Sequence, residues 1–257
     1  MTESELVFYE HPLSERIRIF LRLEFFFSEV AYFIQSGRFW ESQVSLQAFI
    51  EILNILDRND IRSEVLKELE RQSSSLGRLS QFENFAQERS QHLIFEISQQ
   101  VKKLQRITGK LSPIIRASEL LTNIRHRSAI SGGTCGFDIP SYHYWLHLPE
   151  ETKAQELLHW FEEFTPLRES ILLTLKVIRE SGKNLQKTSQ GGLFYHSLDA
   201  QSPTQMVRLG LPLETAVYPE ISGNRHRINI RLMAFAHIER PKQITHDLEF
   251  SLSCCGV

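Results

Sequence analysis

The stretch from residue 221 to residue 235 constrains the fold of this chain more than any other. It reads ISGNRHRINIRLMAF, a turn containing Gly223 followed by strict alternation. One set of alternate positions carries Arg225, Arg227, Asn229 and Arg231, and the other carries His226, Ile228, Ile230 and Leu232. A period of two is typical of a β-strand that buries one face and exposes the other. The stretch therefore predicts a strand with one buried face and one face in water.

The exposed face of this predicted strand concentrates positive charge. Alternate residues on one face of a strand lie about 7 Å apart, so neighbouring guanidinium groups repel one another unless an anion lies close to them. Two sources of that anion stay open. Asp247 and Glu249 would neutralise the row if their strand pairs with it antiparallel. Alternatively the row binds a partner, because arginine forms bidentate hydrogen bonds with carboxylates and phosphates.

The composition is that of an ordinary globular protein. Of the 257 residues, 41% are hydrophobic and 23% are charged, and the formal net charge is -2. Nucleic-acid-binding domains usually carry an overall basic excess, so the charge gives no global case for that function. A basic site in this chain has to be a local patch.

The cysteines and the N-terminus predict a cytoplasmic protein. The three cysteines, Cys135, Cys254 and Cys255, are odd in number, which favours reduced thiols over a disulfide framework. The N-terminus lacks the pattern of a signal peptide. The most apolar early run, residues 17–34, contains four charged side chains, so it predicts a core helix without membrane insertion.

Helical patterns fill the chain between residues 13 and 186. Apolar residues recur at helical spacing over about 15–35, 41–56, 61–76, 83–109, 113–127, 140–148, 150–164 and 165–181. Capping residues mark several of the starts: Ser14, Asp60, the pair Ser80 and Glu83, and Ser112 before Pro113. This region is predicted to form a mostly helical domain of seven to eight helices.

Short alternating segments follow residue 187, at 193–195, 207–211 and 247–252. An N-terminal segment at 5–10 is expected to join their sheet. The chain is therefore predicted to be α+β. Residues 13–186 form the helical domain, and residues 1–12 together with 187–257 form a small antiparallel β domain.

Several patterns that suggest an enzyme are incomplete. His143 and His147 share a helix face and, with Glu150 or Glu151, could make a three-ligand metal site, but aromatic packing with histidines at its rim explains the pattern better. The loop at 132–133 lacks the spacing of a phosphate-binding motif, and no serine lies in a nucleophile elbow. We therefore expect a binding protein with a local basic patch, and no catalytic residue, cofactor or metal.

Several short motifs occur together in one order along the chain. They lie at 9–13 with Arg18, 21–25, 61–64, 66–69, 132–133, 137–140 with His143, 145–149, 218–223, Arg227 with 230–231, 248–250 and 254–255. Together they resemble the ZapD family, bacterial proteins associated with the Z ring of cell division.

The resemblance implies a specific function. Members of this family are non-enzymatic dimers of the cytoplasm, concentrated at the midcell division ring. They bind the partly acidic, partly apolar C-terminal tail of FtsZ through basic residues that line a pocket, and they bundle FtsZ filaments. The matching positions are Arg227, Arg231 and Arg62, with Arg22, Arg116 and His143 as expected neighbours. The role of Arg225 stays open, and the alternative function is nucleic-acid binding through the same basic face.

Overall fold

The computed structural model describes residues 6–79, 87–107, 109, 111–199 and 204–256. The chain divides into two compact units. The β unit comprises Met1–Ile19 and Leu175–Val257, and the helical unit comprises Phe20–Thr174. Both boundaries fall inside long helices, and the domain limits predicted at residues 13 and 186 stay a prediction.

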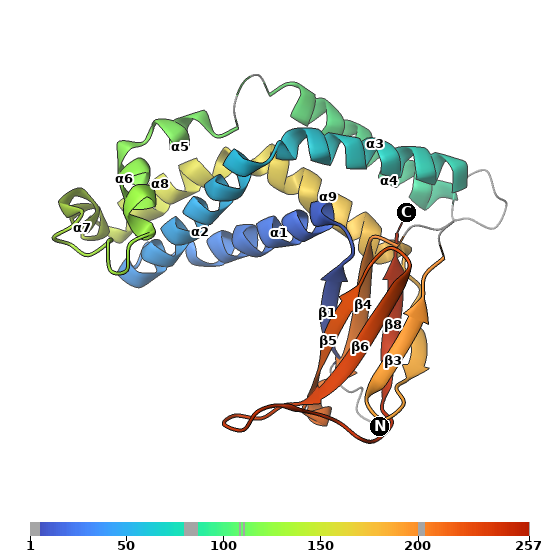
Figure 1. Cartoon of the computed structure of the whole chain (residues 1–257). Helices are drawn as coiled ribbons and strands as arrows, with labels where there is room; N and C mark the ends of the chain where they lie inside the picture. The colour runs from blue at the N-terminus through green and yellow to red at the C-terminus, as the bar shows by residue number, and fades with distance from the viewer. Residues whose placement is uncertain (1–5, 80–86, 108, 110, 200–203, 257) are drawn as a thin grey trace. The chain divides into compact units, whose positions relative to one another are not determined.

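The described residues contain nine α-helices. Their bounds are α1 Glu15–Phe33, α2 Phe39–Arg58, α3 Ile61–Leu79, α4 Gln87–Gln105, α5 Pro113–Ala117, α6 Glu119–Ser128, α7 Pro140–Leu146, α8 Glu150–Glu162 and α9 Thr165–Ser181. Within the helical unit, α3 and α4 run side by side, and α2 packs against α6, α7 and α8 (Figure 1).

Aromatic side chains form the centre of the helical unit. Phe27, Phe49 and Phe164 are almost completely buried. The ring of Phe164 lies 5.9 Å from the rings of both Phe27 and Phe49, and Phe161 lies 6.2 Å from Phe49. Aromatic rings at these separations contribute packing energy beyond their buried area. The apolar periodicity seen in the sequence is thus explained by one shared core.

The described part of the β unit contains eight strands. Their bounds are β1 Leu6–Pro12, β2 Leu185–Thr188, β3 Leu193–Ser197, β4 Met206–Pro212, β5 Val217–Gly223, β6 Arg227–Ala234, β7 Lys242–Gln243 and β8 Glu249–Cys255, with a 3-10 turn at Leu213–Thr215. Every pairing is antiparallel. Sheet A has the order β1-β4-β8-β2, and sheet B has the order β3-β6-β5, with β7 pairing the end of β6.

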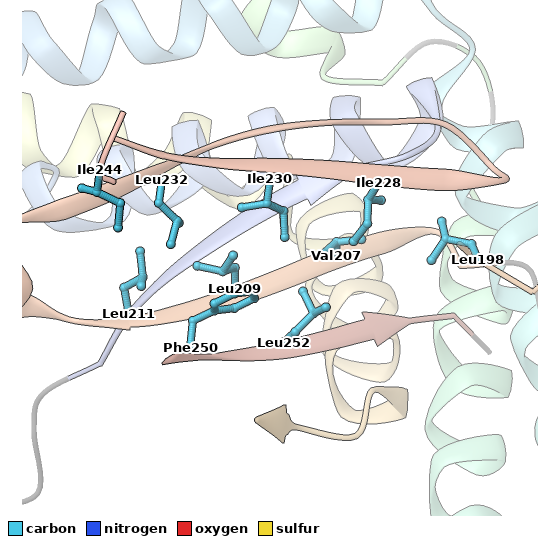
Figure 2. Packing of buried hydrophobic residues seen from close by; sticks show 10 residues of the cluster. All are labelled: Leu198, Val207, Leu209, Leu211, Ile228, Ile230, Leu232, Ile244, Phe250 and Leu252. Carbon is cyan, nitrogen blue, oxygen red and sulfur yellow. The ribbon is translucent and has the colours of Figure 1, made fainter. Parts of the chain in front are cut away.

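The two sheets pack face to face around one apolar core. Figure 2 shows Ile228, Ile230 and Leu232 of β6 facing side chains of β4 and β8. The facing set is Val207, Leu209, Leu211, Phe250 and Leu252, all buried. Antiparallel sheets bury alternate residues in this way. The α+β class, the helical domain and the C-terminal β segment predicted from the sequence are confirmed.

The N-terminal strand joins the C-terminal ones, as the sequence predicted. Tyr9 of β1 lies opposite Leu209 of β4. The predicted helix caps have mixed outcomes. Ser14 accepts a hydrogen bond from the Ile17 amide at 3.3 Å, and Asp60 accepts one from the Ser63 amide at 3.2 Å, so both caps are confirmed. The predicted pair of Ser80 and Glu83 lies outside the described residues.

The helix predicted over 113–127 is divided in two. Ser118 adopts an extended conformation, with φ -69° and ψ 114°, and its side chain accepts a hydrogen bond from the Leu121 amide, which starts α6. Ser112 was predicted to cap the first part, but it has left-handed φ and ψ and makes no side-chain capping bond. Serine competes for backbone donors within a helical pattern, which explains the break and the extra helix.

Within the described part of the chain, none of the helices combines the length and the hydrophobicity needed to span a bilayer.

Candidate partner-binding site

Strand β6 places its arginines on the outer face of sheet B. Arg227 and Arg231 are exposed, whereas Ile228, Ile230 and Leu232 between and beyond them are buried. Directly paired residues of an antiparallel ladder project to the same side, which adds residues of β3 and β5 to this surface. The arginine face thus consists of Leu193, Tyr195 and Ser197 of β3, Glu220 and Ser222 of β5, and Arg227, Asn229 and Arg231 of β6.

The acidic strand does not neutralise these arginines. Glu249 begins β8, which pairs with β4 and β2 in sheet A, whereas β6 belongs to sheet B. Asp247 instead accepts a hydrogen bond from the Gly191 amide at 2.8 Å. The suggested pairing of Asp247 and Glu249 with the arginine row was therefore wrong. Its physical reason is that the two strands lie on opposite layers of the sandwich.

The partner of Arg231 lies on the neighbouring strand. Glu220 is directly opposite Arg231 in the β5–β6 ladder, and its carboxylate accepts hydrogen bonds from Nε at 3.1 Å and from an Nη atom at 2.5 Å. About half of each side chain stays exposed, 52% for Arg231 and 48% for Glu220. An ion pair this exposed contributes little to stability, typically up to about 1 kcal/mol, so it can exchange for another carboxylate.

Arg227 and Arg225 differ from Arg231 in their ion pairing. Among the described residues, no carboxylate lies within ion-pair distance of either guanidinium. Arg225 lies in the turn before β6, and its Nε donates to His226 Nε2 at 2.9 Å. The arginine face therefore carries uncompensated positive charge, centred on Arg227.

Two other arginines of the β unit, Arg179 and Arg208, form ion pairs with one carboxylate of the same unit. Glu10 of β1 accepts two hydrogen bonds of 2.7 Å from Arg179 of α9 and lies 2.9 Å from Nε of Arg208 on β4. All three side chains are at least three-quarters buried. Such a network leaves these arginines little freedom to bind a ligand.

In the helical unit, Arg62 and Arg116 line one pocket. Its volume is about 290 Å³, and its lining is Leu56, Asp57, Asn59, Asp60, Ile61, Arg62, Gly109, Leu111 and Arg116. Arg62 Nη1 donates to the carbonyl of Ile107 at 2.6 Å, and Arg116 Nε donates to the carbonyl of Leu111 at 2.8 Å. Both side chains thus line the same cavity, and each is held by a hydrogen bond to a backbone carbonyl.

Asp57, which lines this pocket, forms ion pairs with two arginines. Its carboxylate pairs with Arg116 and, at 2.6 Å, with Nη1 of Arg125, whose Nε donates to Asn54 at 2.9 Å. Burial acts to raise the pKa of Asp57, but the hydrogen bonds from the two arginines outweigh it and lower the pKa below its usual value. Asp57 therefore positions both arginines and also competes with any carboxylate that enters.

Replacing Asp57 by asparagine is expected to lower the free energy of unfolding by about 1 kcal/mol at pH 7, since the site is partly exposed and solvent weakens the ion pairs. The pKa of Asp57 is lower in the folded state, so its contribution is present above the unfolded-state pKa and is lost as the pH falls through the folded-state value. Denaturation of both proteins between pH 7 and pH 3 measures this. A difference that grows toward acid pH would contradict the assignment.

The remaining expected site residues lie elsewhere in the helical unit. Arg22 is exposed on α1, and His143 is exposed on α7 with its ring 4.5 Å from that of His147. No hydrogen bond or ion pair between described residues joins either side chain to Arg62 or Arg116. His147 Nδ1 lies 2.8 Å from the carbonyl of His143, and no group of three metal-binding side chains occurs among the described residues.

Sequence reasoning did not identify the carboxylates that hold the arginines. No motif or apolar periodicity marks Asp57, Glu220 or the additional cation Arg125 as part of a site. The position of Arg125 near the end of a predicted helix is explained equally well by an interaction with the helix dipole. The turn before β6 could have suggested Glu220. The segments on either side of a turn often pair antiparallel, which places Glu220 opposite Arg231.

Several known proteins that are similar to this chain share one name. A family model described as "ZapD: Cell division protein" matches residues 21–231. The chain belongs to the ZapD family of cell division proteins. It is 35% identical over 249 residues to the cell division protein ZapD of Methylococcus capsulatus, which covers 97% of this chain and 98% of the relative.

Two further ZapD proteins match over nearly their full length. The one from Azoarcus sp. is 36% identical, with 97% of this chain and 99% of the relative covered. The one from Coxiella burnetii is 33% identical, with 97% of each covered. The range matched by the ZapD family model includes all six expected partner-binding residues, from Arg22 to Arg231.

Proposed function

We propose that this ZapD family member is a non-enzymatic division factor that binds the C-terminal tail of FtsZ. It acts as a dimer in the cytoplasm at the midcell ring, crosslinks FtsZ filaments and so stabilises the Z ring. Membership of the ZapD family supports a role in division. The arginine face supports an acidic partner.

The observation that carries the proposal is the exposure and the ion pairing of Arg227. Its side chain is exposed on strand β6, and no carboxylate among the described residues pairs with it. A tail carboxylate would therefore gain a bond to Arg227 without displacing an internal partner. Hydrogen bonds to charged groups contribute roughly 1.5–3 kcal/mol each, and Arg231 can add a second one by exchanging Glu220 for the tail.

The pocket of Arg62 and Arg116 is a second candidate site for an FtsZ tail. Its two guanidinium groups are held by backbone carbonyls, which keeps them oriented before a ligand arrives. Asp57 and Asp60 line the same pocket, so it favours a single carboxylate over a strongly charged anion. Arg22 and His143 are further proposed contacts of the tail.

Dimerisation would convert tail binding into crosslinking. A filament presents many tails, and a dimer presents two equivalent sites. The second binding event is then intramolecular and gains from a raised effective concentration. Modest affinity for one tail is thus compatible with firm attachment to a filament.

Deleting the C-terminal tail of FtsZ tests the proposal. Sedimentation of polymerised FtsZ should carry this protein into the pellet. Polymers of tail-deleted FtsZ, verified by their own sedimentation, should leave it in the supernatant. Electron microscopy of the same samples should show bundles only with the complete FtsZ. Equal pelleting and bundling with tail-deleted FtsZ would contradict binding through the tail.

A further inference from the structure

Strand β3 is an open edge of sheet B. Among the described strands it pairs with β6 alone (Figure 1). An isolated bridge joins Leu193, its first residue, to Gln190. The amide of Leu198 donates to the carbonyl of His226 at 2.8 Å, and the amide of Leu232 donates to that of Gly192 at 2.8 Å. Antiparallel ladders bond alternate pairs, so the backbone N–H and C=O groups of Tyr195 and Ser197 point away from β6.

The opposite edge of sheet B is protected. The bonds from the Asn224 amide to the Arg227 carbonyl, 3.0 Å, and from the Phe235 amide to the Ala216 carbonyl, 2.8 Å, fix the ladder of β5. They direct the backbone groups of Val217, Pro219, Ile221 and Gly223 outward. Proline has no N–H to offer, and it is a usual device for blocking an edge. Among the described strands of sheet B, β3 therefore keeps outward donors and acceptors at both Tyr195 and Ser197, whereas β5 lacks an outward donor at Pro219.

A cavity of about 360 Å³ lies at the end of this open edge. It is lined by His196, Ser197, Leu198, Asp199, Thr204, Cys254 and Gly256. Leu198 is also the last member of the sandwich core, at one end of the cluster in Figure 2. The apolar part of this lining comes from Leu198 and Cys254, whereas His196, Asp199 and Thr204 are polar. Leu198 lies on the inner side of β3, and Tyr195, which is 67% exposed, lies on the outer side.

Charge distinguishes the two sides of β3. On the outer side, Ser197 lies opposite Arg227 in the ladder, and its short side chain leaves the guanidinium free to extend across β3. A strand added to β3 would lie about 10 Å from β6, twice the usual strand spacing, which is within reach of a long arginine and a carboxylate together. On the inner side, the wall formed by Leu198 favours an apolar side chain.

We propose that the partner segment binds as an extended strand along β3. Its backbone pairs with Tyr195 and Ser197, its acidic side chains face Arg227, and an alternate apolar side chain enters the cavity beside Leu198. Strand addition of this kind combines main-chain affinity with side-chain specificity. The inference rests on the proposed function, because it takes the partly acidic, partly apolar FtsZ tail as the segment.

Removing one edge donor tests the strand arrangement. Ser197→Pro deletes an N–H that the β3–β6 ladder does not use, so the sheet should tolerate it. Fluorescence anisotropy with a labelled FtsZ tail peptide should show affinity weakened by about ten-fold or more. Wild-type affinity in a Ser197→Pro protein with an unchanged thermal midpoint would overturn the inference.

Backbone-methylated peptides give a test that needs no variant. Two tail peptides carry N-methyl groups on the two complementary sets of alternate residues. Because only one set of N–H groups faces β3, one peptide should lose about ten-fold or more in affinity while the other binds almost as well as the unmodified peptide. Equal affinities of the two methylated peptides would overturn strand pairing, even if Ser197→Pro failed to fold.

The proposed function and the strand inference fail in different ways. If the unmodified peptide does not bind the wild-type protein, tail binding itself is wrong. If it binds, and Arg227→Glu abolishes binding while Ser197→Pro and both methylated peptides bind normally, the tail uses the arginine face without adding a strand.

Discussion

Replacing Arg227 and Arg231 by glutamate is expected to abolish co-sedimentation with FtsZ polymers. Each substitution removes a charge-assisted bond worth roughly 1.5–3 kcal/mol and introduces repulsion, so affinity for the tail peptide should fall by about 100-fold or more. Both side chains are exposed on the outer face of β6, and neither contributes to the sandwich core. The fold should therefore stay intact by circular dichroism.

A double substitution of the same charge elsewhere is the matched control. Lys102 and Arg106 are exposed on and just after α4, and glutamate at both positions changes the net charge by the same amount. This control should pellet with FtsZ like the wild-type protein. If the two double variants lost pelleting equally, general charge would explain binding and the role of the arginine face would be wrong.

Replacing Phe49 by alanine is expected to destabilise the helical unit by about 3–5 kcal/mol. Phe49 is fully buried and contacts Trp160, Phe161 and Phe164 at ring separations of 6.3, 6.2 and 5.9 Å. Its removal leaves a cavity at the centre of the aromatic cluster, where relaxation is limited by the surrounding rings. Chemical denaturation followed by far-UV circular dichroism, which reports mainly on helix, measures the change.

Phe25→Ala provides the comparison for this core variant. Phe25 lies on α1 with 63% of its surface exposed, so truncation should change the free energy of unfolding by less than about 0.5 kcal/mol. A Phe49→Ala protein as stable as Phe25→Ala would contradict the position of the core.

The sequence predicted what depends on local pattern. Alternation from Arg227 to Leu232 gave the strand and its buried face, because a period of two is a property of the strand itself. The caps at Ser14 and Asp60 were likewise readable, since each cap bonds an amide three residues away. The break at Ser118 was not, because a helical apolar pattern continues through it.

What the sequence could not predict depends on contacts between distant segments. Asp247 and Glu249 were plausible partners of the arginines by charge alone. The strand that Glu249 begins lies in sheet A, however, and the arginines lie in sheet B. The pairing of Arg116 and Arg125 with Asp57 joins α2 to α5 and α6 across more than fifty residues of chain. No periodicity within a helix reports such a contact.

A chemical-shift map of the isotopically labelled protein with unlabelled FtsZ tail peptide tests the central claim most directly. If the arginine face binds the tail, the largest amide shifts should lie in residues 227–231 and in their ladder neighbours on β3, and they should saturate with peptide concentration. Shifts confined to other parts of the chain, with residues 227–231 unperturbed at saturation, would contradict binding at the arginine face.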